Sequence, residues 1–284
     1  MFDIVDPLIS GLMSMKWFWR SLLVGAGLLA VGSPAASQDQ SREANRLHPG
    51  IIGADARVQL EAQGAPWDAI GQVNVDSYRR RGLCTGTLVA PRLVLTAAHC
   101  VMNPITGQAF PPKDIHFVAA VRGEGNKGAS TALCLHVLPT YRYNPPVSYR
   151  PSGAEVRNED LVSDVVVIVL ADNLDVDPAP IDEAVAPAPG LRLTHVAYPA
   201  DHRFEPYVHW NCRLLRSDLV EDLWFNDCDT HPGSSGGPVF TRTGETYRVA
   251  AIMLASGERL YNVAYNVALP VSRWLNLTRN AACP

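Results

Sequence analysis

The chain has 284 residues, of which 47% are hydrophobic and 18% charged, and its formal net charge is −4. This composition is typical of a globular protein, with no sign of disorder and no basic field for nucleic acid. The length is about twice that of a comfortable single core, so we expect one large β unit or two subdomains. The 21 glycines and 22 prolines favour many turns and short strands over a bundle of long helices.

The N-terminal region predicts a secretory signal peptide over residues 1–37. A basic start at 16–20 is followed by an apolar run at 21–32 and by a small-residue exit that ends at Ser37, an order typical of such signals. Met15 is a possible true start, because the stretch before it is acidic. A membrane anchor is the alternative, but the apolar run is shorter than the roughly 20 residues that a spanning helix needs. We therefore expect a secreted or periplasmic protein with oxidised cysteines.

Residues 38–50 are polar and lack apolar periodicity, so they predict a leader or pro-segment before a domain over 51–284. In that domain, short apolar or alternating runs recur between glycines and prolines. Such a pattern favours a sandwich or barrel of β-strands. The runs lie at 87–89, 93–95, 115–121, 133–138, 165–170, 193–198, 207–215, 249–255 and 261–269.

A proline-rich stretch predicts a linker over 173–189, which divides the domain into β halves of about 51–172 and 190–270. A C-terminal helix is expected over 271–280, after a start signal from a proline and a serine. One face of this helix would carry Val271, Trp274, Leu275 and Thr278.

Three segments carry residue types that suit nucleophilic catalysis. They are Leu95-Thr96-Ala97-Ala98-His99-Cys100, Asp164 with the apolar run that follows it, and Gly233-Ser234-Ser235-Gly236-Gly237-Pro238. A serine hydroxyl is a weak nucleophile that needs an adjacent base, and histidine is the usual one. The imidazole needs a buried acceptor for its other N–H, a task for an acid at a strand end. Backbone N–H groups of Gly233 and Ser235 can point together at a developing oxyanion.

Each segment alone also has an ordinary structural interpretation. The histidine is compatible with a packed core side chain, the acid with a strand cap, and the glycine-rich turn with a linker. Found together in the order histidine, acid and serine, the three segments form a much more specific pattern.

These segments resemble those of the trypsin/chymotrypsin family of serine peptidases. The sequences IGADAR at 52–57, PWDAIG at 66–71 and CTGTLV at 84–89 are more similar to its bacterial V8-like, glutamyl-endopeptidase-type branch. The resemblance extends over about 51–275. It implies an all-β fold of two six-stranded antiparallel barrels, an N-barrel and a C-barrel, with the active site between them.

The resemblance also implies a role for each candidate residue. His99 would be the general base, Asp164 would orient it, and Ser235 would be the nucleophile, with Gly233 and Ser235 supplying the oxyanion N–H groups. Glu159 and Asp160 compete with Asp164, which is favoured because a buried strand follows it directly. Ser234 competes with Ser235, which is favoured because it stands immediately before two glycines.

Two departures from the family pattern concern activation and specificity. Ser234 stands where animal relatives carry the aspartate that pairs with a freshly cut N-terminal amine, so that switch is not expected here. Met253 stands where glutamate-specific relatives carry a histidine, so a preference for glutamate is not supported. Asp229 lies six residues before Ser235, where trypsin keeps the acid that binds basic side chains. An Asp-Thr pair at this position, as at 229 and 230, also occurs in V8-like enzymes that do not cut after basic residues. The remaining candidates for lining the substrate pocket are Thr230, Ser256 and Val263.

The resemblance implies a disulfide between Cys84 and Cys100 beside the histidine. Cys212 and Cys228 have a hairpin-like separation and are expected to form a second bridge. Cys134 and Cys283 then remain, and their pairing would join the C-terminal tail to the first half of the domain. No metal is expected, because the sequence lacks Cys-x-x-Cys and His-Glu-x-x-His spacing.

The sequence therefore predicts an exported serine endopeptidase that hydrolyses peptide bonds through an acyl-enzyme and without a cofactor. Its expected partners are peptide and protein substrates, with no nucleic acid and no stable membrane insertion after signal removal. One alternative is a catalytically silent binding or adhesion module on the same fold. Another is an esterase with the same triad, although esterases with a Gly-x-Ser-x-Gly elbow carry the histidine last.

Overall fold

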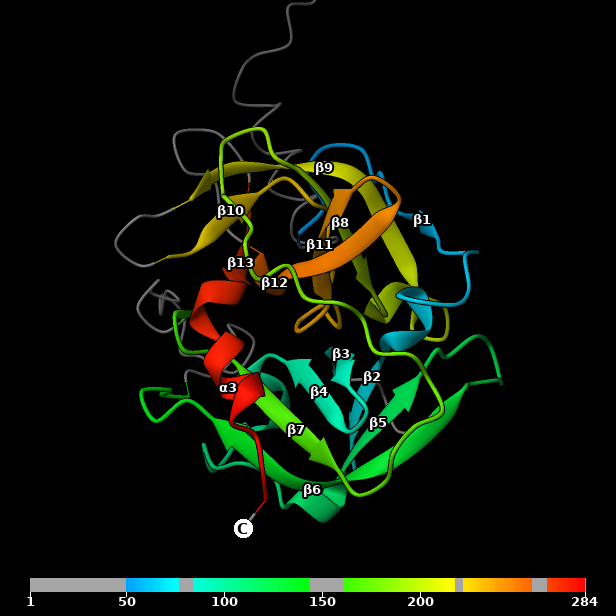
Figure 1. The fold of residues 1–284 in the computed structure, drawn as a ribbon, viewed down its shortest axis with the longest axis vertical. Helices are drawn as coiled ribbons and strands as arrows, with labels where there is room; N and C mark the ends of the chain where they lie inside the picture. Colours follow the sequence, from blue (N-terminus) through cyan, green and yellow to red (C-terminus); the bar gives the residue numbers. More distant parts are fainter. Residues whose placement is uncertain (1–49, 77–83, 144–160, 218–221, 257–264, 284) are drawn as a thin grey trace, which may run out of the picture. The chain divides into compact units, whose positions relative to one another are not determined.

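The computed structural model of the protein describes residues 50–76, 84–143, 161–217, 222–256 and 265–283. In this part the chain forms two closed six-stranded antiparallel β-barrels, as the sequence resemblance implied (Figure 1). The signal peptide predicted over 1–37 lies outside the described residues, as do Glu159, Asp160 and Val263. No helix among the described residues is long and apolar enough to cross a membrane.

The first barrel closes in the strand order β2-β3-β4-β7-β6-β5. Its strands are β2 (Ile70–Val75), β3 (Cys84–Ala90), β4 (Leu93–Thr96), β5 (Ile115–Ala119), β6 (Gly128–Val137) and β7 (Val166–Leu170). Strand β7 reads VVIVL and is buried along its whole length. A continuous apolar run of this kind is typical of a strand that is covered on both faces. Short 3-10 helices interrupt the loops of this half at η1 (Trp67–Ala69), η2 (Ala98–Val101) and η3 (Pro112–Asp114).

The second barrel closes because β9 pairs with both β10 and β8, at the two ends of the order β9-β10-β13-β12-β11-β8. A short strand, β1 (Val58–Gln59), adds to the outer edge of β9. The barrel strands are β8 (Arg192–Ala197), β9 (Tyr207–Ser217), β10 (Trp224–Asn226), β11 (Pro238–Thr243), β12 (Thr246–Ser256) and β13 (Asn266–Pro270). The loop between β8 and β9 contains the 3-10 helix η5 (Ala200–His202).

The proline-rich linker is hydrogen-bonded to both barrels. The amide of Ala179 donates to Leu88 O of the first barrel at 2.9 Å. In the second barrel, Val249 donates to Pro180 O at 2.8 Å and accepts from the Asp182 amide at 2.9 Å. The linker is therefore a fixed part of the fold, which its proline content alone did not indicate.

The C-terminal helix is shorter than predicted and consists of two pieces, η6 (Val271–Arg273) and α3 (Leu275–Arg279). They meet at Trp274, whose φ and ψ of −128° and −8° are not helical. The Trp274 side chain is fully buried, and its indole N–H donates to Leu269 O at 3.2 Å. Packing of this indole into the core therefore interrupts the helix that the apolar spacing predicted.

Three disulfide bonds cross-link the described residues, and they join the pairs expected from the sequence. Cys84–Cys100 and Cys212–Cys228 each close a short loop of 16 residues' separation, whereas Cys134–Cys283 spans 149. Because Cys134 lies in β6, the long bridge holds the C-terminal tail on the first barrel. Arg273 reinforces this contact by donating from its Nε to Val162 O at 3.2 Å.

An aromatic cluster packs the start of the first barrel against the second. Trp67 in η1 lies 5.5 Å from Trp210, 5.6 Å from Phe240 and 4.8 Å from Tyr247, measured between ring centroids. These three partners belong to β9, β11 and β12. Since aromatic side chains bury large apolar areas, this cluster is a main contact between the barrels.

We predict that Trp67→Ala lowers the free energy of unfolding by about 3–5 kcal/mol, the usual cost of truncating a buried aromatic residue. Urea unfolding followed by tryptophan fluorescence and by circular dichroism measures the change. Phe204→Ala serves as the control, because that ring is 54% exposed and its loss should cost only about 0.5 kcal/mol or less. Equal losses in the two variants would contradict the assigned role of the cluster.

Candidate functional site

His99 and Asp164 are joined by two hydrogen bonds within the first barrel. The Asp164 carboxylate accepts from the backbone N–H of His99 at 2.8 Å through Oδ1, and Oδ2 lies 2.7 Å from His99 Nδ1. Asp164 lies two residues before the buried strand β7, and His99 lies in η2 after β4, which is the strand paired with β7. The barrel register therefore brings the two residues together. With Nδ1 bonded to a carboxylate, the ring presents Nε2 as a base.

The environment of His99 favours its protonated form. Burial disfavours a charged imidazole, but the charge of Asp164 and its hydrogen bond outweigh burial and raise the pKa of His99 above its usual value. The Asp164 side chain is 6% exposed and the His99 side chain 20% exposed. The imidazole thus keeps one accessible edge while its carboxylate partner is shielded from water, and this shielding strengthens their interaction.

Ser235 lies in a tight turn of the second barrel that packs directly on the first. Gly236 has a φ of +77°, and a Cβ at this position would lie 2.0 Å from Thr96 Oγ1 and 2.8 Å from Ala97 N. Only glycine fits this approach. Because Ala97 is two residues from His99, the contact carries Ser235 to the end of the first barrel where His99 lies.

Thr85 of β3 attaches this turn to the first barrel, a role that sequence analysis did not assign. Its backbone N–H donates to Ser235 O at 2.9 Å, and its hydroxyl donates to Gly233 O at 2.9 Å. The same hydroxyl accepts from the Tyr198 amide at 2.9 Å. Thr85 belongs to the CTGTLV segment that carried the resemblance, but a threonine in a strand gives no signal of such a role.

The Ser235 hydroxyl donates to Leu254 O at 3.3 Å. In the described part of the chain, this is the hydrogen bond recorded for Ser235 Oγ, and none joins it to His99. Reaction with a substrate would therefore require the hydroxyl to turn from Leu254 O toward His99 Nε2. Such bonds are often formed only when the substrate is bound.

Gly233 heads the turn in a conformation that suits oxyanion binding. Its φ is +97°, and a Cβ there would lie 2.7 Å from Tyr198 O and 3.1 Å from Ala200 N. Among the hydrogen bonds recorded for the described residues, the backbone N–H groups of Gly233 and Ser235 have no acceptor. Backbone N–H groups without a partner can donate to a developing negative charge, so the oxyanion role predicted for Gly233 and Ser235 stays a prediction.

The other predicted pocket residues that the structure describes differ in burial. Met253 is buried and exchanges backbone hydrogen bonds with the turn, accepting from Gly236 N at 2.7 Å and donating to Gly237 O at 2.9 Å. Thr230 is buried as well, whereas Ser256 is exposed at the end of β12. Met253 thus holds the turn at residues 233–237 through its backbone.

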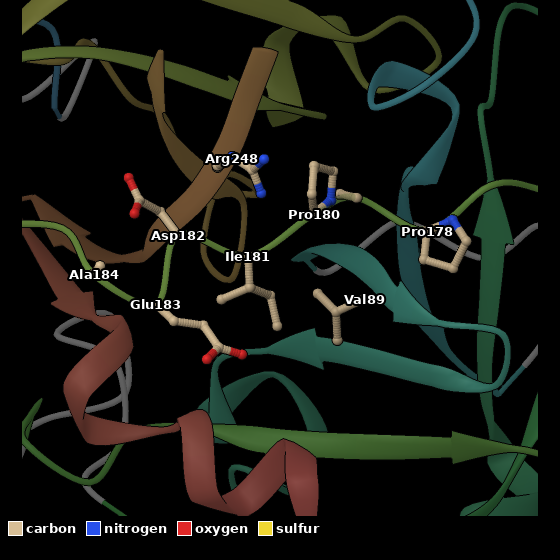
Figure 2. Close-up of a pocket in the computed structure, with 9 residues that line it drawn as sticks. Val89, Pro178, Pro180, Ile181, Asp182, Glu183, Ala184 and Arg248 are labelled. Atoms are coloured by element: carbon tan, nitrogen blue, oxygen red, sulfur yellow. The ribbon is translucent and has the colours of Figure 1, made fainter. Parts of the chain in front are cut away.

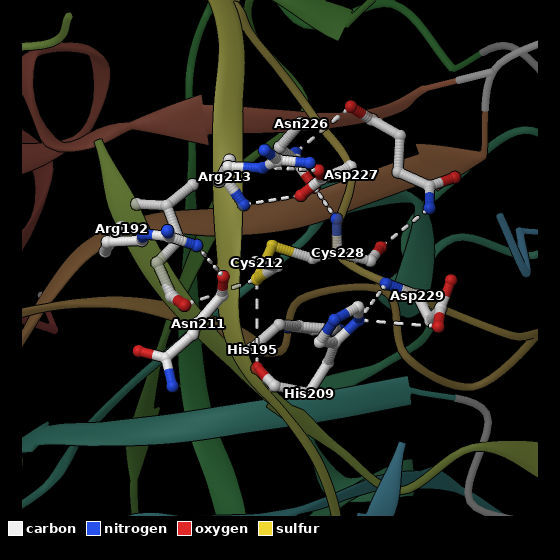
Figure 3. Close-up of a disulfide and its surroundings, with 12 residues drawn as sticks. Arg192, His195, His209, Asn211, Cys212, Arg213, Asn226, Asp227, Cys228 and Asp229 are labelled. Atoms are coloured by element: carbon white, nitrogen blue, oxygen red, sulfur yellow. Dashed lines mark hydrogen bonds and ion pairs between the residues drawn. A yellow bond between two sulfur atoms is a disulfide. The ribbon is translucent and has the colours of Figure 1, made fainter. Parts of the chain in front are cut away.

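Asp229 has other partners than a substrate in this structure. Its side chain is 1% exposed, and its two oxygens accept from the amides of Ile52 at 2.7 Å and Ala56 at 2.8 Å. His209 Nδ1 lies 3.4 Å from Oδ2 and accepts from the Asp229 amide at 2.8 Å (Figure 3). Each carboxylate oxygen therefore accepts at least one hydrogen bond from the chain itself, and the role of Asp229 in a basic-residue pocket stays untested.

A second histidine, His195, lies behind the nucleophile turn and was not singled out from the sequence. It is 2% exposed, and its Nδ1 lies 3.0 Å from Pro238 O. Because a carbonyl oxygen only accepts, Nδ1 carries the proton of the neutral ring. Burial lowers the pKa of His195 to about 4, and the nearby His209 and Arg57 add to the effect. His195 is thus a neutral structural histidine at pH 7, in contrast to His99.

Two surface hollows lie away from His99 and Ser235. The larger, of about 630 Å³, follows the linker at 178–184 beside Val89 and Arg248 (Figure 2). The smaller, of about 490 Å³, lies between residues 52–56 and β9.

Among the described residues, one group of side chains of metal-ligand type contains His99 together with Cys84 and Cys100. The two cysteines form a disulfide and offer no thiolate to a metal.

Comparison with known proteins gives a family and a fold. The sequence model of the trypsin-like peptidase domain matches residues 84–247, more than half of the chain. The solved structure of a Glu endopeptidase in complex with MPD is similar to this one with a TM-score of 0.61 at 20% identity. The similarity covers 81% of this chain and 100% of that one. No curated protein matches the sequence.

We predict that His99 and His195 titrate on opposite sides of the ordinary histidine pKa of about 6.5. His99 should titrate above this value and His195 near pH 4. NMR titration of the imidazole resonances measures both. Asp164→Asn should lower the pKa of His99, because burial remains while the negative charge is lost, and should leave His195 unchanged. An unshifted His99 in that variant would contradict the assigned pairing.

Proposed function

Because the chain belongs to the trypsin-like peptidase family, we propose that it is an exported serine endopeptidase. The proposed reaction hydrolyses a peptide bond through an acyl-enzyme on Ser235, with His99 as base and Asp164 as its positioning partner. The observation that carries this proposal is the double hydrogen bond between His99 and Asp164, which leaves Nε2 as the basic atom of the ring. No cofactor enters the proposed mechanism.

The proposed reaction begins when the Ser235 hydroxyl leaves Leu254 O and attacks the substrate carbonyl. His99 Nε2 takes the hydroxyl proton and then donates it to the departing amine, while Asp164 stabilises the imidazolium. The oxyanion formed in each tetrahedral intermediate would accept from the Gly233 and Ser235 amides, each worth about 10²–10³ in rate. Water, activated by the same imidazole, then releases the acyl group.

Export is supported by two features that are independent of the catalytic residues. The N-terminal sequence has the order of a secretory signal, and the described chain holds three disulfides. Disulfides of this kind persist in oxidising compartments. We therefore propose that the peptidase acts outside the cytosol, in the periplasm or the medium.

We propose no acidic or basic preference for the residue before the cut bond. Met253 occupies the position at which glutamate-specific relatives carry a histidine, and the oxygens of Asp229 accept from Ile52 and Ala56. Cleavage-site profiling on a peptide library tests this statement. A strict requirement for Glu, or for Lys and Arg, would contradict it.

We predict that Ser235→Ala and His99→Ala each abolish peptide hydrolysis to a similar degree, since a triad acts as a unit. Asp164→Asn should reduce kcat by about 10⁴, because the tautomer and orientation of His99 are lost. The measurements are steady-state kinetics on a fluorogenic peptide mixture and labelling of Ser235 with a fluorophosphonate. Thr243→Ala is the control, because it removes an exposed hydroxyl at the end of β11, and it should keep both labelling and turnover.

These measurements also separate the proposal from its two alternatives. A silent binding module would leave Ser235 unlabelled in folded, processed protein. An esterase would label Ser235 and hydrolyse ester substrates but leave peptides intact. A nearly unaffected Asp164→Asn variant would instead assign the positioning role to another acid.

A further inference from the structure

The segment Gly50–Arg57, called here the amino-terminal segment, is hydrogen-bonded to Asp229 and Thr230. These two residues precede the nucleophile turn, which comprises residues 233–237. Gly50 O accepts from the Thr230 amide at 3.0 Å and from Asn266 Nδ2 at 2.9 Å. Gly50 has a φ of +92°, and a Cβ there would lie 2.7 Å from Thr230 O. The segment is therefore closely packed against residues that immediately precede His231.

Asp229 fixes the middle of this segment. Its two carboxylate oxygens accept from Ile52 and Ala56 at 2.7 and 2.8 Å, so they hold the backbone amides of both residues. Burial raises the pKa of Asp229, while these two hydrogen bonds and His209 act against that shift. A buried carboxylate is tolerated when it accepts several hydrogen bonds, and the amino-terminal segment supplies two of them.

Arg57, at the end of the segment, joins it to η5. The Arg57 side chain is 4% exposed. Its Nη2 lies 2.7 Å from Asp201 Oδ2 and 2.8 Å from Asp55 Oδ2, and its Nη1 lies 3.2 Å from Asp201 Oδ1. The bond to Asp201 is thus the bidentate pairing to which a planar guanidinium is suited and an ammonium is not.

The 3-10 helix η5, which contains Asp201, contacts the residues just before Gly233 at two points. The amide of Ala200, the first residue of η5, donates to Pro232 O at 2.6 Å. Asp201 Oδ1 lies 3.6 Å from His231 Nδ1, a distance that makes an ion pair when the imidazole is protonated. His231 in turn donates its amide to Ser234 Oγ at 3.2 Å and accepts from the Ser234 amide at 2.9 Å. These bonds enclose Gly233.

We propose that Arg57 is a positioning residue that holds the nucleophile turn in place through Asp201 and His231. Asp229 anchors the amino-terminal segment, which carries Arg57. The proposal rests on the function proposed above. In this proposal Arg57 orders Gly233. Ser234 is neutral, so it cannot order Gly233 through an ion pair of its own. Because Arg57 acts through η5 and touches neither Ser235 nor His99 in the recorded contacts, its loss should affect turnover more than substrate binding.

The test compares Arg57→Met with Arg57→Lys and with wild type in the full processed protein. Methionine keeps the length of the side chain and removes the charge. The carboxylates that lose their partner, Asp55 and Asp201, have side chains that are 45% and 26% exposed and remain hydrated. We expect Arg57→Met to lower kcat by roughly 10- to 100-fold, less than the 10²–10³ lost when an oxyanion donor is removed outright, with KM changed by less than about threefold. Lysine should restore part of kcat.

Asp201→Asn and a matched surface variant complete the kinetic comparison. Asp201→Asn should lower kcat in the same way, and the double variant with Arg57→Met should be less than additive, because both changes break one pair. Arg242→Met is the control, since it removes an exposed arginine that pairs with Glu245 on the β11–β12 hairpin. Arg242→Met should keep wild-type kinetics. An unchanged kcat in Arg57→Met overturns the proposal.

Hydrogen–deuterium exchange gives a readout that does not depend on activity. In Arg57→Met, exchange should accelerate in residues 231–237 and in η5, while the strands of both barrels stay as protected as in wild type. Faster exchange throughout the chain, or a loss of kcat without faster exchange at 231–237, assigns Arg57 a merely structural role and overturns the proposal. If wild type neither cleaves peptides nor labels at Ser235, the proposed function fails, and exchange still decides whether Arg57 holds the turn.

Discussion

The contact between the nucleophile turn and the first barrel is the constraint on which the site depends. His99 and Asp164 belong to one barrel and Ser235 to the other, so their relation is set by how closely the two barrels approach. Gly236 permits an approach at which a Cβ would lie 2.0 Å from Thr96 Oγ1 and 2.4 Å from Thr85 O. Thr85 then bonds the turn on both sides of Ser235, at Gly233 O and at Ser235 O.

The fold and the catalytic candidates are predictable from the sequence because each depends on a local pattern. The apolar run after Asp164 marks a buried strand, and the barrel register pairs its first residue, Val166, with Thr96 at the end of β4, three residues before His99. The glycines around Ser235 are required because other chain segments approach its backbone closely, so the glycine pattern in the sequence indicates this close packing. The cysteine pairs follow from family resemblance, separation and elimination. In each case a few adjacent residues carry the information.

Polar partners chosen across long separations are not predictable in this way. Asp229 and Ile52 are 177 residues apart, and Arg57 and Asp201 are 144 apart. An isolated aspartate gives the same signal whether it accepts from backbone amides or binds a cationic substrate, and its position in the family pattern left both roles open. The C-terminal helix differs for a related reason. The apolar spacing around Trp274 is helical, but the indole bonds to Leu269 O and breaks the helix.

The buried acid at Asp229 links specificity to order in the amino-terminal segment. A carboxylate with 1% exposure needs hydrogen-bond donors, and those donors can come from a substrate side chain or from the chain itself. Here Ile52 and Ala56 supply them. The carboxylate therefore holds the segment that carries Arg57. The same hydrogen bonds make the geometry of Gly233 depend on residues 50–57.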